Sequence, residues 1–178
     1  MIYIVTALKP EAQAFIDRYK LLKSRLNSYA FFSNNKIKVI ISGLGVYNSM
    51  MATQTLIDNF DIKDEDIFIN VGICGADKSY RIGELIEIGS IVYDKKKYII
   101  DKNITTTITC QDTEAKSSEN SLVDMESFGF YDAIIHSPAI KEFHIFKVVS
   151  DYFEPEKVTK DKTKSLIFNV IDDILKKV

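Results

Sequence analysis

Four acidic side chains stand directly after short apolar segments, where they could meet a common ligand. They are Glu11, Asp124, Glu126 and Asp151. A carboxylate in such a place can accept hydrogen bonds from hydroxyl groups, hold a proton for transfer or activate a water molecule. Each acid also has a simpler explanation, because acids at the start of a helix commonly cap it or interact favourably with its dipole. A purely structural domain does not need so many acids in these places, and we interpret them as a candidate site.

Two of these acids have neighbours that indicate a more specific chemistry. Met125 precedes Glu126, a pair that suits a sugar, because methionine can pack on the ring face while the carboxylate accepts hydrogen bonds from paired hydroxyls. Asp151 follows Ser150 at the end of an apolar run, and an acid in such surroundings can act as a proton donor. The alternatives are that Glu126 caps a helix and that Asp151 caps the turn before Pro155.

Two glycine-containing loops also follow strand-like runs. The first reads Ser42-Gly-Leu-Gly45 and the second reads Gly72-Ile-Cys-Gly75. Glycine lets the backbone approach a ligand closely, and the N-terminus of a following helix favours anions. A dinucleotide-binding fingerprint would need a third glycine at position 48, where the sequence has Asn48. A ligand loop and a tight strand-to-helix turn both remain open for the first loop.

The cysteines and histidines indicate no disulfide framework and no metal site. Cys74 and Cys110 are too few for a disulfide scaffold and are typical of a reducing cytoplasm. We expect Cys74 to be a small buried apolar residue and not a nucleophile. Two histidines, His136 and His144, cannot build a multi-histidine centre. We therefore expect neither a metal nor an organic cofactor.

Length, composition and charge describe a single soluble domain over residues 1–178. The 23 basic and 25 acidic residues give a net charge of -2, which argues against a dedicated nucleic-acid binder. No apolar run approaches the roughly 18–20 residues of a membrane span. The first residues lack the basic region of a signal peptide. These features predict a cytoplasmic protein that binds neither nucleic acid nor membrane.

Segments of strand composition alternate with segments of helical periodicity along the whole chain. Strands are predicted at 2–7, 28–33, 36–43, 67–71, 85–93, 98–100, 104–110, 122–125 and 143–150, and helices at 12–22, 47–60, 126–136 and 158–177. The polar residues 111–121 are predicted to form a surface loop. This alternation predicts an α/β fold with three layers, α/β/α, around a central mixed sheet. Ligands of such sheets bind outside the carboxyl ends of the strands.

Five blocks of the sequence, taken in order, resemble the purine nucleoside phosphorylase and nucleosidase superfamily. The blocks are IYIVTALKPEAQAF, VIISGLGVYNSMMAT, FINVGICGADKSYRIGELIEIGSIV, LVDMESFGFYDA and FKVVSDYFEP. The fourth block resembles a Val-Glu-Met-Glu signature and the fifth an Arg-x-x-Ser-Asp signature. The closest resemblance is to 5′-methylthioadenosine/S-adenosylhomocysteine nucleosidases. It implies a phosphorylase/hydrolase-like fold and cleavage of the N-glycosidic bond of a purine nucleoside or 5′-thionucleoside.

The resemblance also implies a role for each acid. Asp151 would protonate or hydrogen-bond N7 of the leaving purine, and Glu11 would activate the attacking water. Glu126 would accept hydrogen bonds from the ribose 2′- and 3′-hydroxyls, with Met125 packed on the sugar. The other substrate-binding positions are Gly43, Gly45, Gly72, Ile73 and Ser150. The resemblance further implies a homo-oligomer.

Departures from the family pattern favour water over phosphate as the nucleophile. Ile73 stands where a phosphate-binding serine is expected, and only Lys9 lies near the place of an expected arginine. The chain is also about 50 residues shorter than expected for its size class, with the missing length between about 93 and 122. A phosphorylase that takes phosphate as co-substrate, using Lys9, Arg81 and the loop amides, is one alternative. The others are a nucleoside-binding relative without activity and, more distantly, a dinucleotide-binding oxidoreductase.

Overall fold

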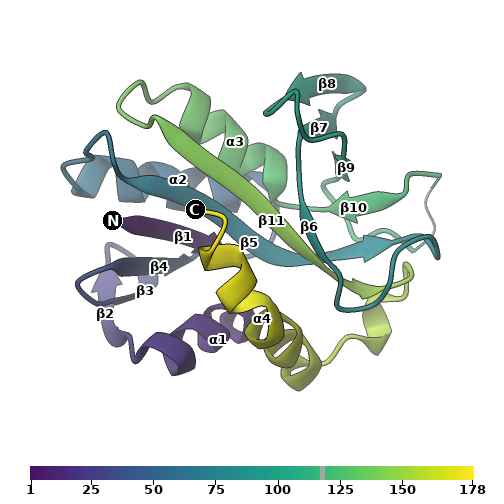
Figure 1. The fold of residues 1–178 in the computed structure, drawn as a ribbon, viewed down its shortest axis with the longest axis horizontal. Coiled ribbons are helices and arrows are strands. Elements are labelled where there is room, and N and C mark those ends of the chain that lie inside the picture. Colours follow the sequence, from purple (N-terminus) through teal and green to yellow (C-terminus); the bar gives the residue numbers. More distant parts are fainter. Residues whose placement is uncertain (117–118) are drawn as a thin grey trace.

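The computed structural model describes residues 1–116 and 119–178, which form a layered fold. Within them, one mixed sheet of 11 strands lies between two pairs of α-helices (Figure 1). The helices α2 (Val46–Asn59) and α3 (Ser127–Ile135) pack together on one face of the sheet. The helices α1 (Lys9–Tyr19) and α4 (Lys160–Leu175) pack together on the other face. The predicted three-layer α/β/α architecture with a central mixed sheet is confirmed.

Four parallel strands form the centre of the sheet. β1 (Ile2–Thr6) lies between β4 (Ile37–Ile41) and β5 (Ile67–Ala76), and β11 (Glu142–Asp151) pairs with β5. These strands are rich in buried β-branched residues, as expected for parallel strands covered on both faces. Because the four strands run the same way, the residues that follow them meet at one edge.

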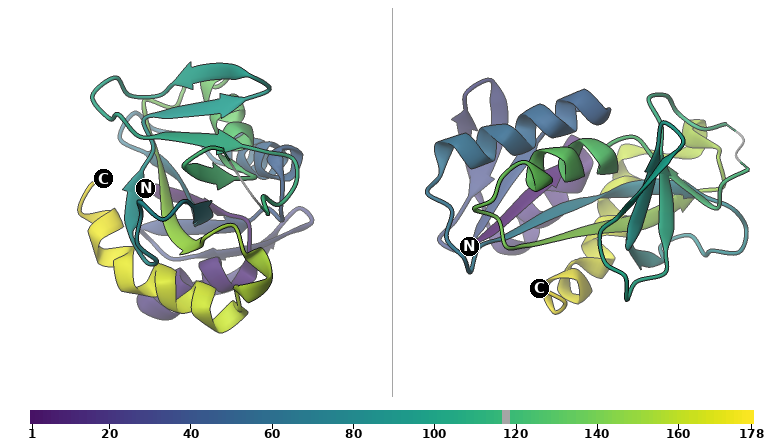
Figure 2. Two further views of the ribbon diagram at one scale, coloured as in Figure 1. Left: turned by 90° about the vertical axis from the view of Figure 1, so that its right-hand side faces the viewer. Right: turned by 90° about the horizontal axis from the view of Figure 1, so that it is seen from above.

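The remaining strands extend the sheet on both sides. On one side, β3 (Tyr29–Ser33) pairs with β4 and β2 (Leu22–Leu26) pairs with β3, both antiparallel. On the other side, the sheet continues from the end of β5 through β10 (Leu122–Asp124), β9 (Thr107–Cys110), β7 (Ser90–Tyr93) and β8 (Lys96–Ile99). Figure 2 shows that β7, β8 and β9 run across the direction of the central strands. The short β6 (Leu85–Glu87) pairs antiparallel with β11.

Two predicted boundaries at the ends of segments are wrong. Leu22 was expected on the first helix, but Lys20 adopts a left-handed conformation (φ 53°) and ends α1, so Leu22 begins β2 and is exposed. The strand predicted to close at Gly72 continues to Ala76 because β11 pairs with it as far as Gly75. The strand β2 itself was not predicted, since its side chains alternate with no clear apolar face.

The segment predicted as one strand over 85–93 is divided in two at Gly89. A Cβ atom on Gly89 would lie 1.9 Å from the carbonyl oxygen of Ile104, so the backbones meet closely there. β6 before this point pairs with β11, and β7 after it pairs with β8 and β9. Of the predicted loop 111–121, Ser117 and Ser118 lie outside the described residues.

The two helices above the site approach each other through Gly129. A Cβ atom on this residue would lie 1.9 Å from the carbonyl oxygen of Val46 at the start of α2. The contact is therefore between backbones, and it sets where α3 begins relative to the loop before α2. No helix in the described part of the chain has the length and apolar character that a bilayer span requires.

Replacing Gly129 with alanine is expected to destabilise the protein. Alanine in a helix normally gains up to about 1 kcal/mol over glycine, but here the added methyl group would force the two helices apart, at a cost of about 1–3 kcal/mol or more. Urea denaturation should show a lower free energy of unfolding. Ile135→Ala on the exposed end of the same helix is the control and should change stability far less. An unchanged or raised stability of Gly129→Ala would contradict this description of the helix contact.

Candidate active site

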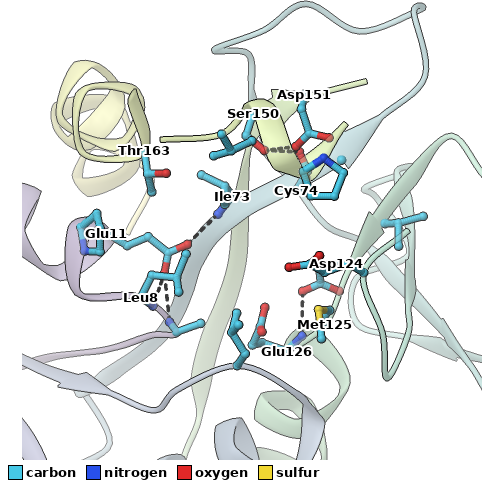
Figure 3. Close-up of a pocket in the computed structure, with 18 of the residues that line it drawn as sticks. Leu8, Glu11, Ile73, Cys74, Asp124, Met125, Glu126, Ser150, Asp151 and Thr163 are labelled. Atoms are coloured by element: carbon cyan, nitrogen blue, oxygen red, sulfur yellow. Dashed lines mark hydrogen bonds between the residues drawn. The ribbon is translucent and has the colours of Figure 1, made fainter. Parts of the chain in front are cut away.

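A cavity of about 300 Å³ lies at the carboxyl ends of the parallel strands. All four acids singled out in the sequence line it: Glu11, Asp124, Glu126 and Asp151. In Figure 3 they surround one space, with Glu11 on one side, Asp124 and Glu126 on another, and Asp151 at the end of its strand. The acids come from four separate elements, so the convergence is produced by the fold and not by closeness in sequence.

Glu11 is held by backbone N–H groups in the first turn of α1. Its Oε2 atom accepts hydrogen bonds from the N–H groups of Ala7 (3.0 Å) and Leu8 (2.8 Å), and its Oε1 atom accepts one from Ile73 (3.0 Å). The side chain is only 2% exposed. Burial raises the pKa of Glu11, and the N–H groups of Leu8 and Ile73 and the charge of Lys147 oppose that rise. Both carboxylate oxygens are therefore fixed in direction by main-chain groups.

Glu126 stands at the start of α3 and is held from the other glycine loop. Its Oε1 atom accepts a hydrogen bond from the N–H group of Gly45 at 2.9 Å. Gly45 has φ 98°, a conformation that side-chain-bearing residues rarely adopt, so glycine is required for this contact. Burial raises the pKa of Glu126 to about 7, with Asp124 and Glu11 adding to the rise and Lys147 and Gly45 opposing it. Glu126 thus changes charge in the neutral pH range.

Asp124 caps the N-terminus of α3. Its Oδ2 atom accepts hydrogen bonds from the N–H groups of Ser127 (2.8 Å) and Glu126 (3.3 Å), and its Oδ1 atom accepts one from the Ser127 hydroxyl (2.6 Å). Capping was the alternative interpretation of an acid here, and it describes Asp124. Because the same residue caps the helix and lines the cavity, it fixes the position of Glu126 two residues later.

Lys147 on β11 was not singled out in the sequence, and it is the cation of the cluster. Its side chain is fully buried, and its Nζ atom forms an ion pair with Asp124 Oδ2 at 2.7 Å. Burial alone would lower the pKa of Lys147, but the carboxylates of Asp124, Glu126 and Glu11 outweigh it and raise the pKa above its ordinary value. One signal could have found it, namely a single lysine inside the apolar run FHIFKVV.

Asp151 lies where β11 ends, beside its neighbour Ser150. Its Oδ2 atom accepts a hydrogen bond from the Ser150 hydroxyl (2.6 Å), and its Oδ1 atom accepts one from the N–H group of Glu154 (2.8 Å). The bond to Glu154 is the turn cap that was the alternative interpretation of this acid. Both interpretations hold at once, because the carboxyl group also lines the cavity.

The predicted substrate-binding residues fall into two groups. Ile73, Met125 and Ser150 line the cavity together with Glu126. The cavity lining does not include Gly43, Gly45 and Gly72, which lie behind it. Gly45 binds Glu126, and Gly72 leaves room for Glu11, whose Oε1 atom lies 3.1 Å from where a Cβ atom would stand. These two glycines therefore position the acids from behind the cavity.

The structure also places the remaining candidates. Cys74 lines the cavity but is 3% exposed, and burial raises the pKa of its thiol, as for the inert cysteine that was predicted. Asp112 accepts a hydrogen bond from the Tyr93 hydroxyl, while Glu114 lines the cavity. Lys160 and Thr163 of α4, which sequence reasoning missed, complete the opposite wall. Their position depends on how α4 packs on α1, and no local pattern indicates it.

Comparisons with known proteins give matches to solved structures only. No protein-family model matches the chain, and no curated protein sequence matches it. The 5′-methylthioadenosine/S-adenosylhomocysteine nucleosidase of Neisseria meningitidis, in complex with methylthio-immucillin-A, matches with a TM-score of 0.79 and 14% identity over 99% of both chains. A variant of the same enzyme from Helicobacter pylori, with 5′-methylthioadenosine in its active site, matches at 0.80 and 13% over 99% of this chain and 98% of that one.

A third solved structure has a different activity in its name. The futalosine hydrolase of Helicobacter pylori matches with a TM-score of 0.79 and 15% identity, over 99% of this chain and 97% of that one. At identities this low, the matches establish that the chain has the fold of these hydrolases. They cover the chain almost from end to end, so the fold is shared as a whole.

The buried carboxyl group of Glu126 should make the stability of the protein depend on pH. Its pKa is about 7 in the folded protein against an ordinary value of 4.5, so the folded state binds more protons between these values. The free energy of unfolding should therefore fall as pH rises from about 4.5 to 7, by about 3 kcal/mol at most from this group. The measurement is urea denaturation of wild type and Glu126→Gln across this range.

The difference between the two proteins isolates the contribution of Glu126. Glutamine keeps the shape of the side chain and cannot ionise, so its unfolding curve should lack this part of the pH dependence. Gln54→Glu on the exposed face of α2 is a control for adding a carboxylate at an exposed position, and it should shift the curve little. Parallel pH curves for wild type and Glu126→Gln would show that Glu126 titrates in its ordinary range.

Proposed function

We propose that the protein cleaves the N-glycosidic bond of a purine nucleoside or 5′-thionucleoside, with water as the nucleophile. The observation that carries the proposal is the convergence of Glu11, Glu126 and Asp151 on one cavity at the strand ends. The shared fold supports it, because solved neighbours are named as nucleosidases and hold a nucleoside or a nucleoside analogue. The proposed reaction uses water and the carboxyl groups of the chain, with no cofactor.

The charges that develop in this reaction match the proposed site. Breaking the bond leaves positive charge on the ribose and negative charge on the departing base. Glu126 would accept hydrogen bonds from the 2′- and 3′-hydroxyls and oppose the positive charge, with Met125 packed on the sugar. Asp151 would deliver a proton or a hydrogen bond to N7 of the base. Glu11 would take a proton from the attacking water, for which its two oxygens are already oriented.

The charge of the cavity wall favours water over phosphate. Among the described residues that line the cavity, five are acidic and Lys160, which is exposed, is the one basic residue. Lys9 and Arg81, the candidates for a phosphate site, are not part of this lining. An anion entering beside Glu11 and Glu126 would be repelled, whereas a neutral water molecule would not. This supports hydrolysis over the phosphorylase alternative.

Substituting the proposed catalytic acids should abolish most turnover. Asp151→Asn and Glu11→Gln keep side-chain volume and remove the proton-transfer group, so kcat should fall by about 10²–10⁴-fold for each. The measurement is release of free base, followed by chromatography. Asp132→Asn, an acid on α3 that is not part of the cavity lining, is the matched control and should leave kcat unchanged. Full turnover by Asp151→Asn would rule out the proposed role of that residue.

The nucleophile and the substrate can be identified in the same assay. Adenosine, inosine, guanosine, uridine, 5′-methylthioadenosine and S-adenosylhomocysteine would each be incubated with and without phosphate. We expect base release that does not depend on phosphate. Release that requires phosphate would make the protein a phosphorylase. Thermal stabilisation by a nucleoside with no release from any would indicate a binding protein without activity.

A further inference from the structure

The ammonium group of Lys147 is buried behind the cavity and not exposed in its wall. The side chain is 0% exposed, and Lys147 is not part of the cavity lining. Apart from the ion pair with Asp124, its Nζ atom has no hydrogen bond of good geometry among the described residues. Replacing a buried ion pair by apolar residues commonly preserves or increases stability. The stability of the fold therefore gives little reason for a lysine here.

One line of contacts leads from Lys147 to Glu126. Lys147 Nζ lies 2.7 Å from Asp124 Oδ2, and that same oxygen accepts hydrogen bonds from the N–H groups of Glu126 and Ser127. The charge on Lys147 thus holds the carboxylate that caps α3. Because Glu126 is at the start of that helix, its place beside Gly45 depends on this cap.

A second line of proximity leads from Lys147 to Glu11. Lys147 Nζ and Glu11 Oε1 lie 3.5 Å and 3.1 Å from the same point, the place where a Cβ atom on Gly72 would stand. The absence of a side chain at Gly72 leaves the two charges facing each other across the strand. Lys147 lowers the pKa of Glu11 and of Glu126, against the larger effect of burial. The titratable groups that interact with it come from five elements: Glu11, Cys74, Cys110, Asp124 and Glu126.

We propose that Lys147 is a positioning residue for the proposed hydrolysis, a buried counter-ion that keeps Glu126 and Glu11 ionised and holds Glu126 in place through Asp124. The inference rests on the proposed function for its catalytic consequence. Its electrostatic content does not, because the charge of Glu126 can be followed without substrate. Lys147 itself touches no substrate in this scheme.

The first test measures the ionisation of Glu126 in the absence of any reaction. The free energy of unfolding would be compared between proteins that differ only by Glu126→Gln, in the wild-type background and in Lys147→Met. Removing the ammonium should move the ionisation midpoint of Glu126 upward by about one pH unit or more, since an opposite charge at this range typically shifts a pKa by about 1–3 units. Lys147→Arg keeps the charge and should leave the midpoint in place.

Variants of Asp124 provide the opposite test and cover the case in which Lys147→Met does not fold. Asp124→Asn keeps an oxygen for the cap but removes the charge that disfavours ionised Glu126, so the midpoint should move downward. The double variant Lys147→Met with Asp124→Asn removes both charges without leaving one unpaired. Its midpoint should return toward the wild-type value. A purely structural role would lower stability at every pH without these opposite shifts.

The second test asks whether the same shifts appear in catalysis. If Glu126 must be ionised to bind the ribose, the acid limb of kcat/KM against pH should move upward in Lys147→Met, with about tenfold lower kcat/KM at pH 7 for each unit. Activity should recover at higher pH. The substrate would be the nucleoside with the fastest base release in wild type. Midpoints that stay fixed in both Lys147→Met and Asp124→Asn would overturn the inference, whereas no base release by wild type would overturn only the proposed function.

Discussion

The site depends on one electrostatic arrangement, in which three buried carboxylates face a single buried ammonium group. Glu11, Asp124 and Glu126 are each at most 6% exposed, and Lys147 is fully buried. Four charges in this space would be unstable without partners, because water does not reach them. The chain supplies partners through backbone N–H groups to Glu11 and Glu126, the helix cap at Asp124 and the ion pair at Lys147. The excess of negative charge that remains is the property that a developing positive charge on a sugar would use.

This arrangement explains why glycines surround the site without lining it. Gly45 adopts a backbone conformation that presents its N–H group to Glu126, and Gly72 leaves the space in which Glu11 and Lys147 face each other. Gly129 allows α3 to approach the start of α2, which follows Gly45 directly. Substituting any of the three would displace an acid without removing it. Positions that never contact the ligand are therefore as important to the geometry as the acids themselves.

The layered fold and the four acids could be predicted from the sequence, for a physical reason. Buried parallel strands are recognisable as β-branched apolar runs, and such strands end at a common edge, so Glu11, Glu126 and Asp151 could be expected together. What depends on long-range pairing could not be predicted. The polar strand β2 has no apolar pattern and forms only because β3 lies beside it. The break at Gly89 follows from close contact with Ile104, a residue 15 positions away.

Lys147 shows the same limit within the site. A lysine in a strand usually marks a solvent-facing position, and only the tertiary structure reveals that three carboxylates from other elements surround this one. The acids could be identified singly from their places at strand ends, but their charge states could not, because each depends on the others. The pKa of Glu126, for example, is raised by burial and by Asp124 and lowered by Lys147 and the N–H group of Gly45. The chemistry of the site is thus a property of the assembled cluster: a carboxyl group that titrates near neutral pH exists here only because one cation is buried with three anions. Two cations would leave Glu126 permanently ionised and remove the negative excess, while none would leave it protonated and unable to accept both ribose hydroxyls.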